Sequence, residues 1–311
     1  MDYFVAMVLP RLALGLLISL LIGGVAYRRG SLSRSGVLGA VLTGTTIFGF
    51  GGFTAGVLLV AFFVSSSLLS HFKQNSLQKQ RATEMFDKGG QRDIGQALAN
   101  GGAAALFAIA DFATQNLNLP LLRSQAPHQL FAVATIGALA TACADTWATE
   151  LGVLNHAKPR LITNMRQVEP GTSGGVSRTG LLAALAGTLF IALLAVFISM
   201  VFIWIDSPVY SGIPRTVMTT LSGWLLATLF GVTLGGLLGS LFDSVLGATA
   251  QAIYFSDQRQ KETEKAIEKD GTPNKLIRGW KWLNNDWVNF ISSVVGALIS
   301  AALVTLLIPN P

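Results

Sequence analysis

The sequence predicts an all-α polytopic membrane protein with about eight transmembrane helices, a count of seven or nine being compatible with the same pattern. Hydrophobic residues make up 51% of the 311 residues and charged residues only 12%. Several windows of about 18 or more residues carry few charges, which is the length that a helix needs to cross a bilayer. The single cysteine, Cys143, lies in an apolar run, where a small buried residue is expected and no disulfide framework can form. We therefore expect residues 1–311 to form one integral membrane domain.

The apolar segments place the expected helices in order along the chain. The second segment is short and rich in glycine, which indicates a re-entrant or strongly tilted helix. The seventh is too long for one crossing, which indicates a helix that extends past the bilayer or a break near Gly235–Gly236. The expected ranges are 4–27, 35–49, 52–70, 95–115, 129–151, 179–205, 216–250 and 287–308.

Lysine and arginine determine the expected orientation in the membrane. Of the 22 basic residues, 19 lie in four polar segments that fall on one side if there are eight crossings. The N-terminus is then outside, and the loops near 71–93, 155–178 and 251–283 are cytoplasmic. The net charge of +6 follows from this bias, so it indicates attraction to anionic lipid rather than to nucleic acid. Asp2 in place of a basic segment, and no plastid transit segment, favour a retained first helix in a prokaryotic inner membrane.

The polar segment 256–275 has mixed charge with helical spacing. We expect a solvated helical hairpin or a flap there, with a lid over a cytoplasmic site as the alternative.

Acidic residues at the ends of apolar helices indicate a polar site. Each carboxylate costs roughly 2.5–3.5 kcal/mol at a helix centre, so it must face a wet, protein-lined cavity or a cation. In ADTWATELG, Asp145 and Glu150 are about 140° apart around a helix, so we expect one to reach the site and the other to orient a neighbouring helix or loop. The remaining clusters are Asp243 with Ser244, Gly247 and Gln251, and Asp286 with Asn285 and Asn289.

The assigned orientation brings these clusters to the cytoplasmic helix ends, where we expect the active site. Carboxylates from two helices with hydroxyls and amides nearby suit Mg²⁺, which takes oxygen ligands, keeps several waters and is often shared with phosphates. Histidine is scarce, and neither HExxH nor a Cys/His spacing occurs, so zinc is not expected. We expect Asp145 and Asp243 to hold one Mg²⁺, and Glu150 or Asp286 to orient it or bind a second ion.

Two glycine-rich polar stretches are typical of phosphate-binding loops. In residues 85–102, Lys88 and Arg92 flank a Gly-Gly break just before a helix that should begin near Asp93. In residues 158–180, basic residues flank a loop whose successive N–H groups could form an anion-binding nest. Neither matches a P-loop, a kinase loop or GxGxxG, so each alone is also compatible with a turn that carries positive-inside charge. The residues concerned in this second loop are Lys158, Arg166, Gly171, Thr172, Ser173, Gly174 and Gly175.

Basic loops, an expected Mg²⁺ and a cavity between helix ends predict phosphoryl or nucleotidyl transfer to a substrate held in the membrane. A lipid monophosphate needs no strong general base, because its second pKa is about 6. Two alternatives stay open. A transporter would need a polar path across the membrane, and a CDP-lipid synthase would use the same parts to transfer CMP.

Five sequence blocks carry a family resemblance: DKGGQRDIGQALANGG, ADTWATELG, KPRLITNMRQVEPGTSGGVS, FDSVLGATAQ and NNDWVNFISS. They resemble the signature blocks of the transmembrane protein 19 and phytyl-phosphate kinase family, which is more distantly similar to dolichol and phytol kinases and to phosphatidate cytidylyltransferases. The resemblance implies transfer of phosphate from a nucleoside triphosphate, expected to be CTP, to a prenyl monophosphate, giving the diphosphate. Prenyl chain length, the nucleotide and the oligomeric state, a homodimer included, stay open.

The expected roles combine the resemblance with the residue types. The catalytic set is Asp145, Glu150, Asp243, Lys88 and Arg92, with Asp145, Asp243 and Asp286 as metal ligands. The phosphate- and substrate-binding set is Lys158, Arg166, Gly171, Thr172, Ser173, Gly174, Gly175, Asn100, Ser244, Gln251 and Asn289.

Overall fold

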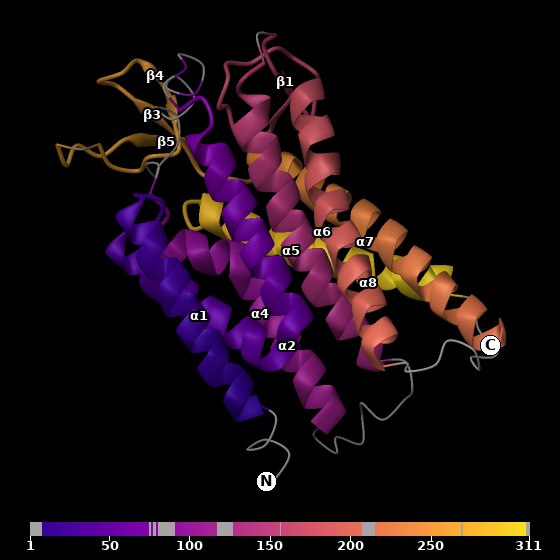
Figure 1. Ribbon diagram of the computed structural model, residues 1–311. Coiled ribbons are helices and arrows are strands. Elements are labelled where there is room, and N and C mark those ends of the chain that lie inside the picture. Colours follow the sequence, from indigo (N-terminus) through magenta and orange to yellow (C-terminus); the bar gives the residue numbers. More distant parts are fainter. Residues whose placement is uncertain are drawn as a thin grey trace.

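In the part of the chain that the structure describes, seven helices that are long and apolar enough to cross a membrane form a bundle (Figure 1), which confirms the predicted class. The computed structural model describes residues 8–74, 76, 79, 91–116, 127–155, 157–206, 215–268 and 270–308. Within these ranges the helices are α1 Leu9–Arg28, α2 Arg34–His71, α4 Ile94–Asn116, α5 Pro127–Gly152, α6 Arg178–Asp206, α7 Arg215–Thr249 and α8 Asn285–Leu307.

Helix α2 contains the two helices expected at 35–49 and 52–70, joined at a sharp reversal. Gly52 has φ +71° and ψ −166°, a conformation that is not helical and that favours glycine. A Cβ placed on Gly44 would lie 3.9 Å from Cδ2 of Leu59, whereas a straight helix would separate these residues by about 22 Å. The arms 34–51 and 53–71 therefore fold back on each other as a helical hairpin. The seven helices consequently supply eight apolar arms.

Helix α5 is the centre of the bundle, because it packs against α2, α4, α6, α7 and α8. Its buried face consists largely of small residues, which lets neighbouring backbones approach closely. A Cβ on Gly137 would lie 2.5 Å from Oγ of Ser300 in α8. The lone thiol of Cys143 is fully buried in this core, as expected.

Helix α7 is continuous, so the break considered at Gly235–Gly236 does not occur. These two glycines serve close packing instead. A Cβ on Gly235 would lie 2.2 Å from Oγ of Ser300, and one on Gly236 would lie 2.8 Å from Cγ2 of Thr188. The alternative, an α7 longer than one ordinary crossing, is the one that the structure supports.

Five short strands lie at one end of the bundle, opposite the start of α1 (Figure 1). The expected helical hairpin at 256–275 is wrong, because the segment belongs to an antiparallel sheet with strand order β4-β3-β5. Turns at Gln260 (φ +50°) and Gly271 (φ +90°) interrupt any helix there, and β-branched and aromatic residues favour β3. The strands are β1 Arg160–Leu161, β2 Gly175–Val176, β3 Ile253–Ser256, β4 Lys261–Thr263 and β5 Lys275–Arg278.

We call this end of the bundle the cavity end. The C-terminal ends of α5 and α7, both ends of the α2 hairpin and the N-terminal ends of α4, α6 and α8 meet here around one large space. Helix α4 begins with a reciprocal cap, in which Asp93 Oδ1 accepts from Gln96 N at 2.9 Å and Gln96 Oε1 accepts from Asp93 N at 3.2 Å. The cap fixes the start of α4, next to Arg92.

Candidate functional site at the cavity end

A cavity of about 1670 Å³ opens at the cavity end and collects most of the residues selected from the sequence. Every helix from α2 to α8 contributes to its wall, as do the loops between α5 and α6 and between α7 and α8. The expected residues that line it are Arg92, Asn100, Asp145, Glu150, Gly171, Thr172, Ser173, Gly174, Gly175, Asp243, Ser244, Gln251, Asp286 and Asn289.

One wall of the cavity is acidic. Asp145 from α5, Asp243 from α7 and Glu264 from the loop after β4 are close enough for their negative charges to repel one another. With its amide nitrogen turned toward the carboxylate, Asn289 of α8 donates to Asp243 Oδ2 at 3.1 Å. The same amide group lies 3.5 Å from Oδ1 of Asn100 in α4. Four helices thus meet at a pair of half-buried carboxylates.

The acidic wall fits an ion that uses few protein ligands. No group of three or more Asp, Glu, His or Cys side chains that could hold a metal occurs in the described part of the chain. Asp145, Asp243 and Asp286 therefore do not form a complete metal cage by themselves. Two neighbouring carboxylates with amide and hydroxyl oxygens nearby match the donor set that Mg²⁺ shares with substrate phosphates and water. The residues present are compatible with such an ion.

Glu150 has a different environment from Asp145. Its Oε2 lies 2.7 Å from Nζ of Lys79, and its Oε1 accepts a 2.5 Å hydrogen bond from Oγ of Ser70. Lys79 Nζ also donates to the carbonyl of Leu69 at 2.7 Å. The carboxylate of Glu150 therefore connects the end of α5 to the end of α2, as expected for a residue that orients a neighbouring element.

Arg92 provides a half-buried positive charge in the cavity wall, close to the carboxylate of Glu150. Its backbone is fixed, because Arg92 N donates to Ser31 O and Arg92 O accepts from Ser33 N, both at 3.0 Å. The guanidinium lies 5.8 Å from the ring centre of Phe63. Burial lowers the pKa of Arg92, and the nearby Glu150 partly offsets this effect. An arginine stays charged even so, and an anion would compensate its desolvation.

The glycine-rich loop 171–175 lines the cavity but is not an open nest of five donors. Thr172 N donates to Glu169 O at 3.1 Å, and Gly175 N donates to Thr172 O at 2.9 Å, so these two N–H groups are already used. Gly174 packs against α7, because a Cβ there would lie 2.5 Å from N of Ala248. At least two of the five N–H groups expected to bind an anion are therefore used within the protein.

Ser173 connects the loop 171–175 to the acidic wall. Its Oγ donates to Glu264 Oε1 at 2.6 Å, and Nε2 of Gln251 donates to the same oxygen at 2.9 Å. Gln251 is almost fully buried. Glu264 thus joins the α5–α6 loop to the end of α7.

Two of the expected phosphate ligands, Lys158 and Arg166, are not in the cavity wall. Lys158 is exposed and forms an ion pair with Glu169. Arg166 is exposed on the turn between β1 and β2, where its N–H donates to Asn164 Oδ1 at 3.1 Å. Neither side chain lines the cavity beside the glycine-rich loop 171–175. Lys88 lies outside the described residues, as do Gly89 and Gly90.

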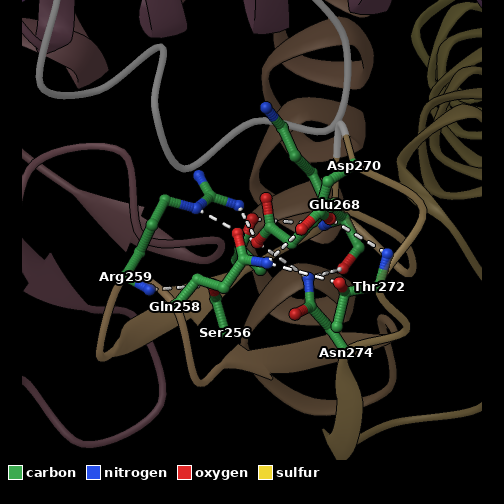
Figure 2. Close-up of polar contacts among 9 residues, drawn as sticks. Ser256, Gln258, Arg259, Glu268, Asp270, Thr272 and Asn274 are labelled. Carbon is green, nitrogen blue, oxygen red and sulfur yellow. Dashed lines mark hydrogen bonds and ion pairs between the residues drawn. The ribbon is translucent and has the colours of Figure 1, made fainter.

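The outer rim of the cavity is a polar cluster on the β3–β5 sheet (Figure 2). Arg259 Nη2 donates to Glu268 Oε1 at 2.5 Å, and Asn274 Nδ2 donates to the same oxygen at 3.0 Å. Hydrogen bonds from Ser256, Arg259 and Asn274 lower the pKa of Glu268 to about 2. The segment expected to be a flap or lid is therefore tied down by charged hydrogen bonds at the cavity mouth.

Sequence reasoning did not select Lys79, Gln96 and Glu264 as site residues. Gln96 had a usable signal, because Arg92, Gln96 and Asn100 are four residues apart and so share one face. Lys79 was indicated only indirectly, by the need of Glu150 for a cation at the end of an apolar helix. Glu264 lies in a charged loop without periodicity, and only the fold brings it to Asp145.

Comparison with known proteins places the chain in a family. The family model described as integral membrane protein DUF92 matches residues 17–297. Protein PGR of Arabidopsis thaliana is 35% identical over 293 residues, which cover 94% of this chain and 95% of that protein. An uncharacterized membrane protein of Methanocaldococcus jannaschii is 33% identical over 185 residues, 60% of this chain and 70% of its own.

A more distant relative, protein VTE6, chloroplastic, of Arabidopsis thaliana, is 23% identical over 279 residues, 90% of this chain and 67% of that protein. No solved structure matches the chain. These relatives agree with the resemblance to the transmembrane protein 19 and phytyl-phosphate kinase family that the five sequence blocks carry. The family match covers most of the sequence and nearly the whole helical bundle. The chain therefore belongs to the DUF92 family of integral membrane proteins.

Proposed function

We propose that the protein is a Mg²⁺-dependent phosphotransferase that converts a prenyl monophosphate to the diphosphate, with a nucleoside triphosphate, CTP in the first instance, as donor. The observation that carries the proposal is that one cavity is lined by charges of both signs from different helices. Arg92 provides a half-buried cation just before α4, while Asp145 and Asp243 provide neighbouring carboxylates on α5 and α7. Such an arrangement suits a metal-bound triphosphate at the two carboxylates and a second phosphate at the guanidinium.

The roles follow from this arrangement. Asp145 and Asp243 would hold Mg²⁺, which when bound neutralises the charge of the donor phosphates. Asn289 orients Asp243 through the 3.1 Å contact. Arg92 would bind the acceptor phosphate, since a guanidinium matches phosphate geometry with paired donors. Glu150 holds Lys79 beside this position, so it acts as a positioning residue.

The proposed phosphoryl transfer does not need a general base. An oxygen of the lipid monophosphate forms a bond to the γ-phosphorus of the nucleotide. The bond from that phosphorus to the β,γ-bridging oxygen breaks, and the nucleoside diphosphate leaves with the electron pair. A monophosphate with a second pKa of about 6 is already largely dianionic near neutral pH. The described part of the cavity wall contains one histidine, His71, at its edge, which is compatible with this chemistry.

The proposed function also implies an orientation of the protein in the membrane. A nucleotide substrate requires the cavity end to face the cytoplasm or its equivalent, and the excess of basic residues in the loops at this end agrees with that orientation. The bilayer and a prenyl phosphate are then the partners.

The test uses purified full-length protein in lipid nanodiscs with Mg²⁺, farnesyl or phytyl phosphate, and CTP labelled at either the α- or the γ-phosphorus. We expect label from the γ-position in the lipid product. Label from the α-position would replace the kinase by a CDP-lipid-type cytidylyltransferase, and no transfer from any nucleoside triphosphate would leave transport as the alternative. Asp145→Asn in the same nanodiscs is the control for contaminating activity.

A further inference from the structure

A second, narrow space lies beside the main cavity, between α1, the α2 hairpin and the start of α4. Its volume is about 80 Å³, and its walls consist mostly of small and apolar residues. Both arms of α2 contribute, with Ala40 and Phe48 on the first and Leu59 and Val60 on the second. Ala40 and Phe48 are about 12 Å apart along their helix, so this space, which we call the apolar groove, extends toward the opposite side of the bundle.

The apolar groove and the main cavity share three residues. Arg92, Gln96 and Asn100 line both spaces and form one stripe along α4. On the other side of this stripe, the Asn100 Oδ1 atom lies 3.5 Å from the amide of Asn289, which contacts Asp243. The guanidinium of Arg92 and the amides of Gln96 and Asn100 therefore lie between the apolar groove and the carboxylates of Asp145 and Asp243.

We propose that the apolar groove holds the first part of the prenyl chain of the lipid monophosphate, with its phosphate at Arg92, Gln96 and Asn100. This inference rests on the proposed function, which requires a lipid phosphate near Asp145 and Asp243. The shared stripe provides the polarity change that an amphipathic phosphate ester needs, because an apolar wall meets a guanidinium at Arg92. The phosphate then lies in the same cavity as Asp145 and Asp243.

The dimensions of the apolar groove select a lipid with one chain. An apolar cavity of roughly 150 Å³ holds a benzene ring, so a space of about 80 Å³ admits a single slender chain and not the two chains of a phosphatidate. Glycines make the channel possible, since a Cβ at Gly44 would lie 2.2 Å from Oγ of Ser19 and one at Gly56 would lie 2.1 Å from Cδ2 of Phe48. The absence of a side chain at these glycines thus lets the walls of the apolar groove pack closely.

Helix α1 is the outer wall of the apolar groove and is weakly held. Only Gly15, Gly23 and Ala26 of its residues are buried, and its principal packing partner is α2. The remaining chain of a long substrate can therefore continue past α1 into the bilayer. Few contacts have to be broken for it to enter.

The test separates chain binding from transfer. The full-length protein in nanodiscs is illuminated with a farnesyl phosphate analogue that carries a diazirine at the end of its chain, without nucleotide. We expect labelled peptides from α1 and α2, competed by farnesyl phosphate but not by phosphatidate. Val60→Phe should reduce labelling at least tenfold by filling the apolar groove. Val64→Phe, one turn further on the same arm, is the matched control, because Val64 is 45% exposed and does not line the apolar groove.

A second pair of variants keeps the experiment informative if one of the first variants fails to fold. Ala40→Phe fills the apolar groove from the other arm, and Ala13→Phe on the exposed side of α1 is its control. In turnover, the ratio of kcat/KM for farnesyl phosphate over dimethylallyl phosphate should fall at least tenfold in both filled variants and stay unchanged in both controls. Wild-type labelling and an unchanged ratio in the filled variants would overturn the inference, as would equal losses in filled and control variants, or competition by phosphatidate.

The experiments distinguish failure of the proposed kinase activity from failure of the proposed chain-binding site. Labelling in the apolar groove without transfer from any nucleotide would contradict the kinase but keep a lipid-phosphate site. Transfer from the γ-position with labelled peptides outside α1 and α2 would contradict the apolar groove but keep the kinase.

Discussion

The ammonium of Lys79 lies 2.7 Å from Oε2 of Glu150, and the two side chains are 7% and 23% exposed. This pair joins the end of the central helix α5 to a residue that follows the α2 hairpin. An ion pair with one almost buried member is costly to break from one side, since the other charge is left desolvated.

Glu150→Gln should therefore lower the free energy of unfolding by about 2 kcal/mol, below the roughly 3–5 kcal/mol of fully buried pairs because Glu150 is partly exposed. Thermal or denaturant unfolding in detergent measures the loss. The double variant Lys79→Met/Glu150→Leu should recover part of it, because no unpaired charge remains. A double variant less stable than Glu150→Gln would contradict this view of the pair.

Asp145→Asn and Asp243→Asn should each reduce turnover on the order of 10²–10³-fold, the range seen when one electrostatic stabiliser of a reaction is removed. Both substitutions keep the size of the side chain, so thermal stability should not fall. The measurement is γ-phosphate transfer at several Mg²⁺ concentrations, and excess EDTA should abolish wild-type transfer. If both variants turn over at the wild-type rate with Mg²⁺, neither carboxylate holds the metal.

The rim at the cavity mouth should loosen in acid. The pKa of Glu268 is about 2, below its ordinary value of 4.5, so its ionised form stabilises the fold. This contribution is fully present above pH 4.5 and is lost as the pH falls toward 2. A spin label on Gln260→Cys should therefore become more mobile between pH 4.5 and pH 2 in the otherwise unaltered protein, and buried Cys143 should not compete for the label.

Glu268→Gln in the labelled protein should show the more mobile spectrum already at pH 7. Asp257→Asn, in the same loop, is the matched control, because the side chains that hydrogen-bond to Glu268 are those of Ser256, Arg259 and Asn274. Equal mobility of the label at pH 6 and pH 2.5 would show that Glu268 does not hold the rim.

Gly52→Ala should destabilise the α2 hairpin by roughly 1–3 kcal/mol, because φ +71° with ψ −166° is a backbone conformation almost confined to glycine. Gly24→Ala in α1 is the opposite case. Its Cβ would meet no atom within 4 Å, and alanine is the better helix former, so stability should stay equal or rise by up to about 1 kcal/mol. Unfolding of both variants in parallel provides the comparison, and equal destabilisation would contradict it.

Hydropathy predicted the helices well because each crossing needs a long apolar segment, and the ends of α4 to α8 differ from the expected bounds by only one or two residues. The small sheet was missed because its strands have three or four residues, too few to show alternation against the charge pattern of 256–275. The antiparallel relation of the two arms of α2 followed from counting 35–49 and 52–70 as successive crossings, whereas the backbone angles of Gly52 that form the reversal were not predicted.

The acidic half of the candidate site was more predictable than the basic half. A carboxylate such as Asp145 in an apolar helix has few acceptable environments, so its presence alone indicates a polar cavity. Lys158 and Arg166 lie in a polar loop, where a basic side chain has many acceptable environments. Their nearness to the glycine loop in sequence did not predict that both side chains are exposed and lie outside the cavity wall.

The reversal at Gly52 has a consequence for how the chain threads the membrane. The two arms of α2 leave and return to the same end, so together they contribute an even number of passes and do not alter the sidedness of any later helix. Removing residues 34–71 would leave α4 entering from the same face, and α5 to α8 would keep their directions. The two arms could therefore both be lengthened without inverting the helices that follow, so the direction of α4 to α8 does not depend on how deeply the α2 hairpin enters the membrane.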